Sequence, residues 1–234
     1  MPARSKSQAL AAASAAMVGG VDAASTVHVL LADVVRLLGA DTGGILVRGD
    51  GDGLELLAAH SHEATELEVH QANSASGPCF DAVKMGRHIK ALGFSDIESR
   101  WPDFAPSLRA AGFGGVHAIP MTWHGRALGG LNLFWHTPTE LSEDEARTAQ
   151  AFADSCTLAI MQSTDGDHDA VLNARVRAAL SGRVTIERAK GILAQLNDLD
   201  MAGAFARLIE LSEESEQPLS ITAADLVATA YTPR

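Results

Sequence analysis

The chain has 234 residues, of which 47% are hydrophobic and 20% are charged, and its formal net charge is -11. This balance is typical of a soluble globular protein with one large domain or two unequal domains. So acidic a chain is not expected to bind nucleic acid through its whole surface. No apolar run is long enough to span a bilayer. The two cysteines lie far apart and favour reduced thiols over a disulfide framework, so we expect a cytoplasmic protein without a membrane segment.

The first 160 residues or so predict an α+β domain. Residues 1–20 are expected to form a flexible or weakly helical lead. The patterns that follow are, in chain order, a helix over Asp22–Leu38, strands over Gly43–Val47 and Leu54–His60 around a hairpin turn, a short helix over Cys79–Met85, a strand over Ile89–Leu92, a helix ending near Gly112, strands over Val116–Trp123 and Leu128–Trp135, and a helix over Thr139–Met161. This order predicts one antiparallel sheet with flanking helices.

After the polar stretch Ser163–Asp167, the chain predicts only helices. The first, Asp169–Leu196, carries an apolar stripe that repeats every seven residues. The stripe consists of Leu172, Ala179, Ile186 and Leu193. A domain of this size cannot cover the apolar stripe of so long a helix by itself. We therefore expect a homodimer in which the stripe lies in or beside the interface. The alternative is that the stripe packs on the N-terminal domain. Two shorter helices are expected after it, over Met201–Ile209 and, beyond a break at Pro218, over Ala223–Tyr231.

Positive charge concentrates on the first of these helices, where residues 175–193 hold five Lys or Arg and one Glu. Arg183 and Lys190 lie seven residues apart, so they share one stripe and are placed to meet phosphates, which supply affinity but no sequence information. The alternative is a solvated face of ion pairs with Glu187, worth about 0.2–0.5 kcal/mol each. Gly191 costs a helix interior about 1 kcal/mol relative to Ala, which is tolerated where a backbone or ligand must come close.

The string Ser181–Leu193 resembles the sequence motif of the ANTAR family of RNA-binding domains, and matches continue to Ser212. The resemblance implies a three-helix, dimerising module over residues 168–231. It also implies an activity: binding of tandem hairpins in a leader transcript, so that a terminator does not form. Carried onto this chain, it implies RNA contacts from Arg183, Arg188, Lys190 and Gly191.

One segment departs from the family. Between the second and third helices, where the family usually has a polar or basic stretch, this chain has Glu213–Ser220 with three carboxylates, which repel phosphate. A second function therefore stays open: a dimeric sensor or interaction module that binds protein partners and has weak or no RNA binding. No enzyme is expected, because the chain has neither a nucleophile motif nor a phosphate-binding glycine loop. No metal is expected either, since His60 and His62, placed on one strand face, have no further ligand at zinc spacing.

Residues 21–163 resemble a GAF domain of the kind fused to ANTAR modules in actinobacteria. The resemblance rests on the overall layout and on Gly77-Pro78-Cys79, Trp101–Ala105, Ala111–Phe113, Val116–Pro120 and Leu128–Leu133. It implies a non-catalytic sensory domain that binds a small molecule beside its sheet and so controls RNA binding, while the cofactor or ligand stays unknown. Buried aromatics are more often core than ligand walls. The candidate pocket residues are Cys79, Phe80, Trp101, Phe104, His117 and Trp123.

Overall fold

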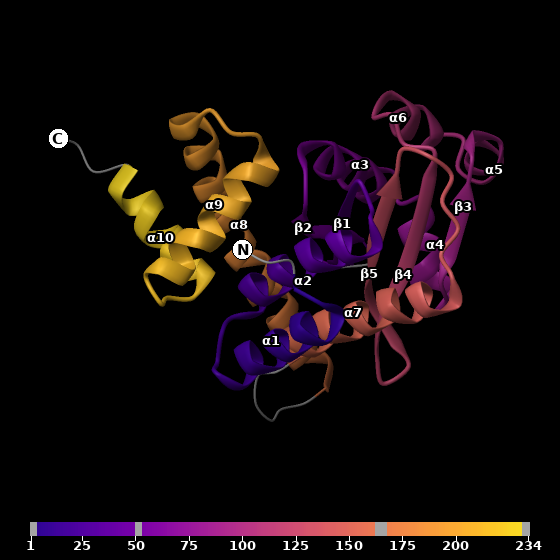
Figure 1. Cartoon of the computed structure of the whole chain (residues 1–234). Helices are drawn as coiled ribbons and strands as arrows, with labels where there is room; N and C mark the ends of the chain where they lie inside the picture. Colours follow the sequence, from indigo (N-terminus) through magenta and orange to yellow (C-terminus); the bar gives the residue numbers. More distant parts are fainter. Residues whose placement is uncertain (1–3, 50–52, 162–167, 231–234) are drawn as a thin grey trace.

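The computed structural model describes residues 4–49, 53–161 and 168–230, without the side chains of 168–175 and Ala178. Its N-terminal domain is an α+β fold built on a five-stranded antiparallel sheet in the order β2-β1-β5-β4-β3 (Figure 1). The strands are β1 (Thr42–Arg48), β2 (Leu54–Ala59), β3 (Ile89–Leu92), β4 (Gly115–Trp123) and β5 (Arg126–Trp135). Both the fold class and the position of each strand agree with the sequence patterns.

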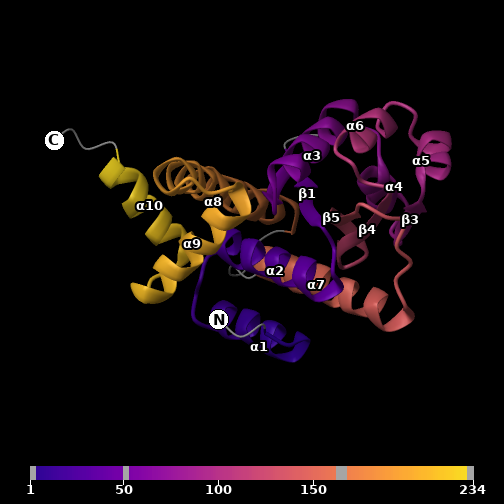
Figure 2. The ribbon, with the colours of Figure 1, turned by 45° about the horizontal axis from the view of Figure 1, so that its top comes forward.

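Helices cover both faces of this sheet (Figure 2). One face packs on α2 (Ala23–Leu38) and α7 (Glu143–Met161), with α1 (Lys6–Val18) lying against these two helices. The other face packs under α3 (His62–Ser74), α4 (Pro78–Met85), α5 (Phe94–Arg100) and α6 (Ala105–Ala110). Within the described ranges, no helix is both long enough and apolar enough to cross a membrane.

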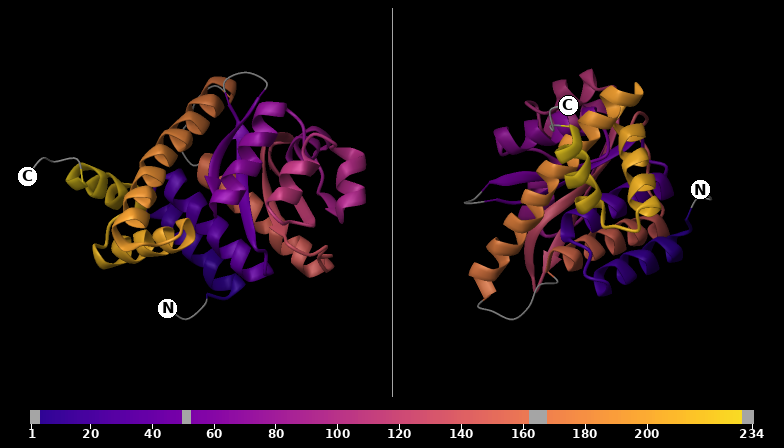
Figure 3. Two further views of the ribbon diagram at one scale, coloured as in Figure 1. Left: turned by 90° about the horizontal axis from the view of Figure 1, so that it is seen from above. Right: turned by 90° about the vertical axis from the view of Figure 1, so that its left-hand side faces the viewer.

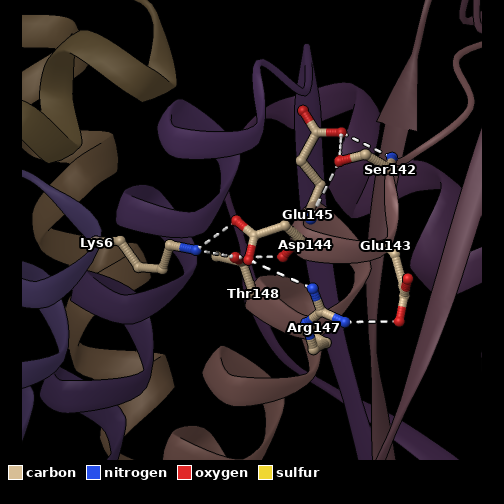
Figure 4. Close-up of polar contacts among 7 residues, drawn as sticks. All are labelled: Lys6, Ser142, Glu143, Asp144, Glu145, Arg147 and Thr148. Atoms are coloured by element: carbon tan, nitrogen blue, oxygen red, sulfur yellow. Dashed lines mark hydrogen bonds and ion pairs between the residues drawn. The ribbon is translucent and has the colours of Figure 1, made fainter.

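Helix α1 occupies most of the segment where the sequence predicts a flexible or weakly helical lead. It begins with a capping box, in which the Ser5 and Gln8 side chains each accept a hydrogen bond from the other's backbone amide. The alanine-rich sequence favours a helix, and its buried alanines pack in the core that α2 and α7 form. Lys6 Nζ also contacts Asp144 Oδ2 at 2.9 Å and Thr148 Oγ1 at 2.7 Å on α7 (Figure 4). The helix is therefore part of the N-terminal domain.

The C-terminal helices gather beside α2 and the β2 edge of the sheet (Figure 3). They are α8 (His168–Asn197), α9 (Met201–Glu214) and α10 (Leu219–Ala230). Asp200 caps α9 by accepting a hydrogen bond from the Gly203 amide. Helix α10 begins directly after Pro218 instead of at Ala223, because proline is tolerated at a helix start, where its missing amide has no partner to lose.

Three of the four residues in the seven-residue stripe of α8 are buried within the chain. Ala179 packs in the core of the N-terminal domain, and Ile186 and Leu193 pack with α9, α10 and Ala24 of α2. The side chain of Leu172 lies outside the described residues. Because contacts within one chain bury the three described residues of the stripe, a second copy of the chain is not needed to cover them. The homodimer stays a prediction, and its interface would have to be another surface of the molecule.

Candidate functional site

One face of α8 lies along the edge of the sheet that β2 forms. Arg183 Nη1 donates a hydrogen bond to the Leu56 carbonyl oxygen at 2.7 Å, and Lys190 Nζ donates to the Ala59 carbonyl oxygen at 3.4 Å. Both carbonyls belong to β2, which has no strand beyond it on that side. The two cations therefore bind backbone carbonyl oxygens of an edge strand. Unpaired N–H and C=O groups on such a strand can form hydrogen bonds with another strand.

Glu187 lies at the centre of this face. Its Oε1 atom is 3.0 Å from Lys190 Nζ and 3.5 Å from Nε2 of His28 on α2. Burial raises the pKa of Glu187, but the nearby His28 ring and the charge of Lys190 outweigh this and lower it to about 2. The Lys190 side chain is only 2% exposed, and its ammonium lies 5.6 Å from the centre of the Phe205 ring. We call Arg183, Glu187 and Lys190 the docked face.

A second face of α8, opposite to its apolar stripe, is exposed. Its residues follow one another at spacings of four and three, which is the period of one helix face. They are Arg177, Ser181, Val184, Arg188, Gly191 and Gln195, all exposed. A Cβ atom added at Gly191 meets nothing within 4 Å. The four residues that the sequence assigned to RNA thus divide into two groups, with Arg183 and Lys190 on the docked face and Arg188 and Gly191 on the exposed face.

Gly191→Ala is expected to stabilise the protein by about 0.5–1 kcal/mol, because the new methyl group meets open space and the helix gains propensity. The matched change is Gly182→Ala on the same helix, where the added Cβ would lie 2.7 Å from the Ala24 Cβ atom. That change is expected to destabilise the contact between α8 and α2. Urea unfolding of both variants checks the pair, and equal effects of the two substitutions would contradict it.

The six candidate pocket residues are divided among several parts of the described GAF domain. Cys79 and Phe80 pack with β1 and β2, whereas Trp101 and Phe104 belong to a separate core under α5 and α6. Trp123 packs on the α2 side of the sheet. Of the six, His117 is the one that lines a cavity of about 520 Å³ near β3, and the other five are not among its lining residues.

A buried acid that the sequence did not single out lies between α3 and the sheet. The Glu68 side chain is fully buried, and its two oxygens accept hydrogen bonds from Asn132 Nδ2 at 2.8 Å and from Gln71 Nε2 at 3.1 Å. Burial raises the pKa of Glu68 to about 8, which the hydrogen bond from Asn132 only partly offsets. A Cβ at Gly44 would lie 2.6 Å from this carboxyl group, so the glycine makes room for it.

Cys79 lies beside this acid at the start of α4. Its backbone amide donates to Gln71 Oε1 at 3.0 Å, and burial, with the charge of Glu68, raises the pKa of the thiol. Burial also raises the pKa of Cys156 to about 12. Both thiols are buried and free, in agreement with the reduced cysteines that the sequence favours, and burial keeps them protonated.

One expectation about the histidines is wrong. His62 is the first residue of α3, so the placement of His60 and His62 on one strand face is wrong. Among the described residues, no group of three His, Cys, Asp or Glu side chains is arranged to hold a metal ion.

Two family models match the chain, one after the other. The model of the GAF domain matches residues 21–161. The chain belongs to the GAF domain family. The model of the ANTAR domain matches residues 174–227, so the GAF–ANTAR organisation inferred from the sequence is confirmed. The two models assign regulatory domains to both parts of the chain.

Solved structures show the same fold for the GAF domain. The GAF domain of an Acinetobacter phosphoenolpyruvate-protein phosphotransferase is 12% identical, covers 69% of this chain and 96% of its own, and has a TM-score of 0.53. The corresponding domain from Coxiella burnetii is 15% identical over 68% and 95%, with a TM-score of 0.52. A phycoerythrobilin-bound GAF domain from a cyanobacterial phytochrome is 17% identical over 68% and 95%, also at 0.52. None of the curated proteins matches the chain.

Proposed function

We propose that the chain is an RNA-binding regulator of transcription antitermination, which binds tandem hairpins in leader transcripts through its ANTAR domain under control of its GAF domain. The observation that carries this proposal is the position of α8. This helix lies in the ANTAR domain, yet it contacts α2, α7 and β2 of the GAF domain. One element therefore holds the basic RNA surface and the contact to the sensor. A cytoplasmic homodimer is part of the same proposal.

RNA meets the exposed face of α8 first. Arg188 provides a charge for a phosphate, and Gly191 lets a nucleic-acid backbone approach the helix closely. Neither residue contributes to packing in the described part of the chain, since Arg188 is exposed and Gly191 faces open space. A mid-helix glycine without a packing role is expected where a ligand comes close.

The docked face supplies the control. Lys190 reaches RNA phosphates only when α8 leaves β2, because its side chain is 2% exposed and its ammonium contacts the Ala59 carbonyl oxygen and Glu187. Arg183 is half-buried and gives one donor to the Leu56 carbonyl oxygen, so release of α8 frees that donor as well. The docked and released arrangements form an equilibrium, and a ligand of the GAF domain shifts it to the extent that it binds one arrangement better. Full RNA affinity thus requires release of α8.

Arg188→Ala is expected to weaken binding to an RNA of two tandem hairpins and to reduce the slope of log K against log salt by about one, because one phosphate contact is lost. The control is Arg147→Ala, an exposed arginine on α7 that pairs with Glu143. Fluorescence anisotropy over a series of salt concentrations measures both. If the two variants bind equally well and with equal slopes, the RNA surface is not the exposed face of α8.

A second function is favoured by the connection between α9 and α10. Glu213, Glu214 and Glu216 are all exposed there, as a phosphate-repelling patch within the ANTAR domain. This patch suits a module that binds protein partners and little or no RNA. Crosslinking and sequencing of RNA from cells separates the two functions: no enrichment of any transcript, beside a stable protein complex, would favour the protein-binding module.

A further inference from the structure

A cavity of about 520 Å³ lies where β3 ends the sheet, at the edge opposite to the one that α8 covers. Lys90 of β3 and His117 of β4 are partners in the strand register, so their side chains lie on one face of the sheet. Lys90 also pairs with Glu140, just before α7, so these two side chains lie on the α7 face, while Asp81 and Met85 of α4 and Arg100 of α5 line the cavity from around the β3 edge. The volume lies in the range of small-molecule sites.

Two histidines form an ordered chain in the wall of this cavity. His117 Nε2 lies 2.9 Å from the Thr139 carbonyl oxygen, and His117 Nδ1 lies 2.9 Å from His88 Nε2. A carbonyl oxygen only accepts, so His117 carries its hydrogen on Nε2, and His88 Nε2–H donates to His117 Nδ1. His88 Nδ1 is then left with a lone pair. This chain fixes both rings and leaves one acceptor for a further donor.

Burial favours the uncharged forms of both histidines, and the uncharged form of His88 is the one with a lone pair on Nδ1. Burial is the main cause and lowers the pKa of His88 to about 4, with the nearby His117 and Lys90 adding to it. Burial likewise lowers the pKa of His117.

Cations outnumber carboxylates around the cavity, in a chain that is acidic overall. Arg87, Lys90 and Arg100 line it, against Asp81 and Glu140. Both carboxylates have partners, since Glu140 pairs with Lys90 and Asp81 accepts a hydrogen bond from Trp101 Nε1 at 3.1 Å.

The two arginines remain as candidate anchors. Arg87 contacts the Met85 sulfur at 3.4 Å and forms no ion pair within the described residues. Arg100 donates one hydrogen bond to the Lys90 carbonyl oxygen at 2.6 Å, lies over the Trp101 ring, and has Asp96 at 3.6 Å. Guanidinium groups have five donors and bind carboxylate or phosphate in a bidentate manner.

The geometry points to a binding site for a small organic anion, in which Arg87 and Arg100 bind a carboxylate or phosphate group and His88 Nδ1 accepts a hydrogen bond from a ligand hydroxyl or amine. The site predicts that the ligand of the GAF domain is a small organic anion. The inference rests on the proposed function only for the effect of this ligand on RNA binding. The site is connected to the RNA-binding helix through few elements: Thr139 and Glu140 lead into α7, which packs on α2 and contacts α8.

Isothermal titration calorimetry of the full chain with inorganic phosphate, succinate and glycerol 3-phosphate tests the site, because these probes separate phosphate from carboxylate and test for a hydroxyl donor. We expect saturable binding of at least one probe, with a shift of the His88 and His117 ring signals in NMR spectra. Arg87→Ala should weaken this binding at least tenfold. The matched control is Arg109→Ala, an exposed arginine on α6 outside the cavity, which should bind as the wild type does.

Absence of binding for all three probes, or equal affinity in the Arg87→Ala variant, would overturn the site. Because Arg87 is exposed, its loss leaves the core intact, and a circular dichroism spectrum checks this. Titration of tandem-hairpin RNA with and without saturating probe then tests the second step separately. A probe that changes RNA affinity in the wild type alone supports both proposals. Binding without any change in RNA affinity supports the site and contradicts its role in control.

Discussion

Glu68→Gln is expected to stabilise the protein at pH 8 by on the order of 3 kcal/mol. The pKa of Glu68 rises from 4.5 to about 8 on folding. Between these values, the folded protein keeps a proton that the unfolded chain has lost. The contribution of Glu68 is therefore fully present below about pH 4.5 and is lost as the pH rises to about 8, by up to about 1.4 kcal/mol per pH unit. Glutamine does not titrate, so the variant should lose this dependence.

The surroundings of Glu68 also suit a neutral amide. Asn132 Oδ1 is buried and has no hydrogen-bond partner among the described residues, because its amide nitrogen faces the carboxyl oxygens. With that amide turned round, the oxygen accepts a hydrogen bond from a protonated Glu68 or from the NH₂ group of glutamine. The remaining oxygen at position 68 still accepts from Gln71.

Urea unfolding at pH 5 and pH 8 measures this effect. The control is Glu66→Gln, the same change on the same helix at an exposed residue that pairs with His62. We expect the Glu68 variant to gain stability mainly at pH 8 and the Glu66 variant to follow the wild type at both values. A wild-type stability that does not fall between pH 5 and pH 8 would contradict the burial of a protonated acid.

Ala24→Leu is expected to release α8 and to tighten binding of tandem-hairpin RNA by tenfold or more. Ala24 is 1% exposed and belongs to the core that α8, α9 and α10 form, so its side chain faces the ANTAR domain. Since a Cβ at Gly182 would already lie 2.7 Å from Ala24, no room exists for three more carbons. Overpacking of this kind destabilises a packed state by about 1–3 kcal/mol. Only the docked arrangement is destabilised, so the equilibrium shifts toward the released one.

Two measurements on this variant are needed together. Fluorescence anisotropy gives the RNA affinity, and hydrogen exchange at β2 and α8 shows whether the contact has opened. Ala11→Leu on the exposed side of α1 is the control for added apolar volume. If exchange shows that α8 is released while RNA affinity stays the same or falls, then the docked arrangement does not restrain RNA binding, and the proposed control is wrong.

The order of strands and domains could be predicted because it depends on local patterns. The strand at Ile89–Leu92 has the predicted bounds, and the hairpin of β4 and β5 follows from alternation around a short turn. The ANTAR helix was found from a contiguous motif. In such cases, the residues that decide the structure are neighbours in the sequence.

The candidate site was less predictable because its partners are distant in sequence. Lys190 and the Ala59 carbonyl are 131 residues apart, and Glu68 and Asn132 are 64 apart. No spacing rule connects such pairs. From charge pattern alone, Arg183 and Lys190 fit an RNA surface or a solvated face of ion pairs, whereas the fold places them against backbone carbonyls. Helix α3 was missed because its sequence is largely polar and Glu68 is indistinguishable there from a surface acid.

The position of α8 along β2 has a consequence for the lifetime of the released form. When Arg183 and Lys190 leave, the Leu56 and Ala59 carbonyls lose their donors, and a strand of mostly buried leucines and alanines stands uncovered at the rim of the sheet. Such a rim pairs readily with any extended segment, including the same strand of another molecule. Under the proposed release of α8, this exposed edge strand favours a rapid return of α8 after RNA dissociates and promotes self-association at high protein concentration.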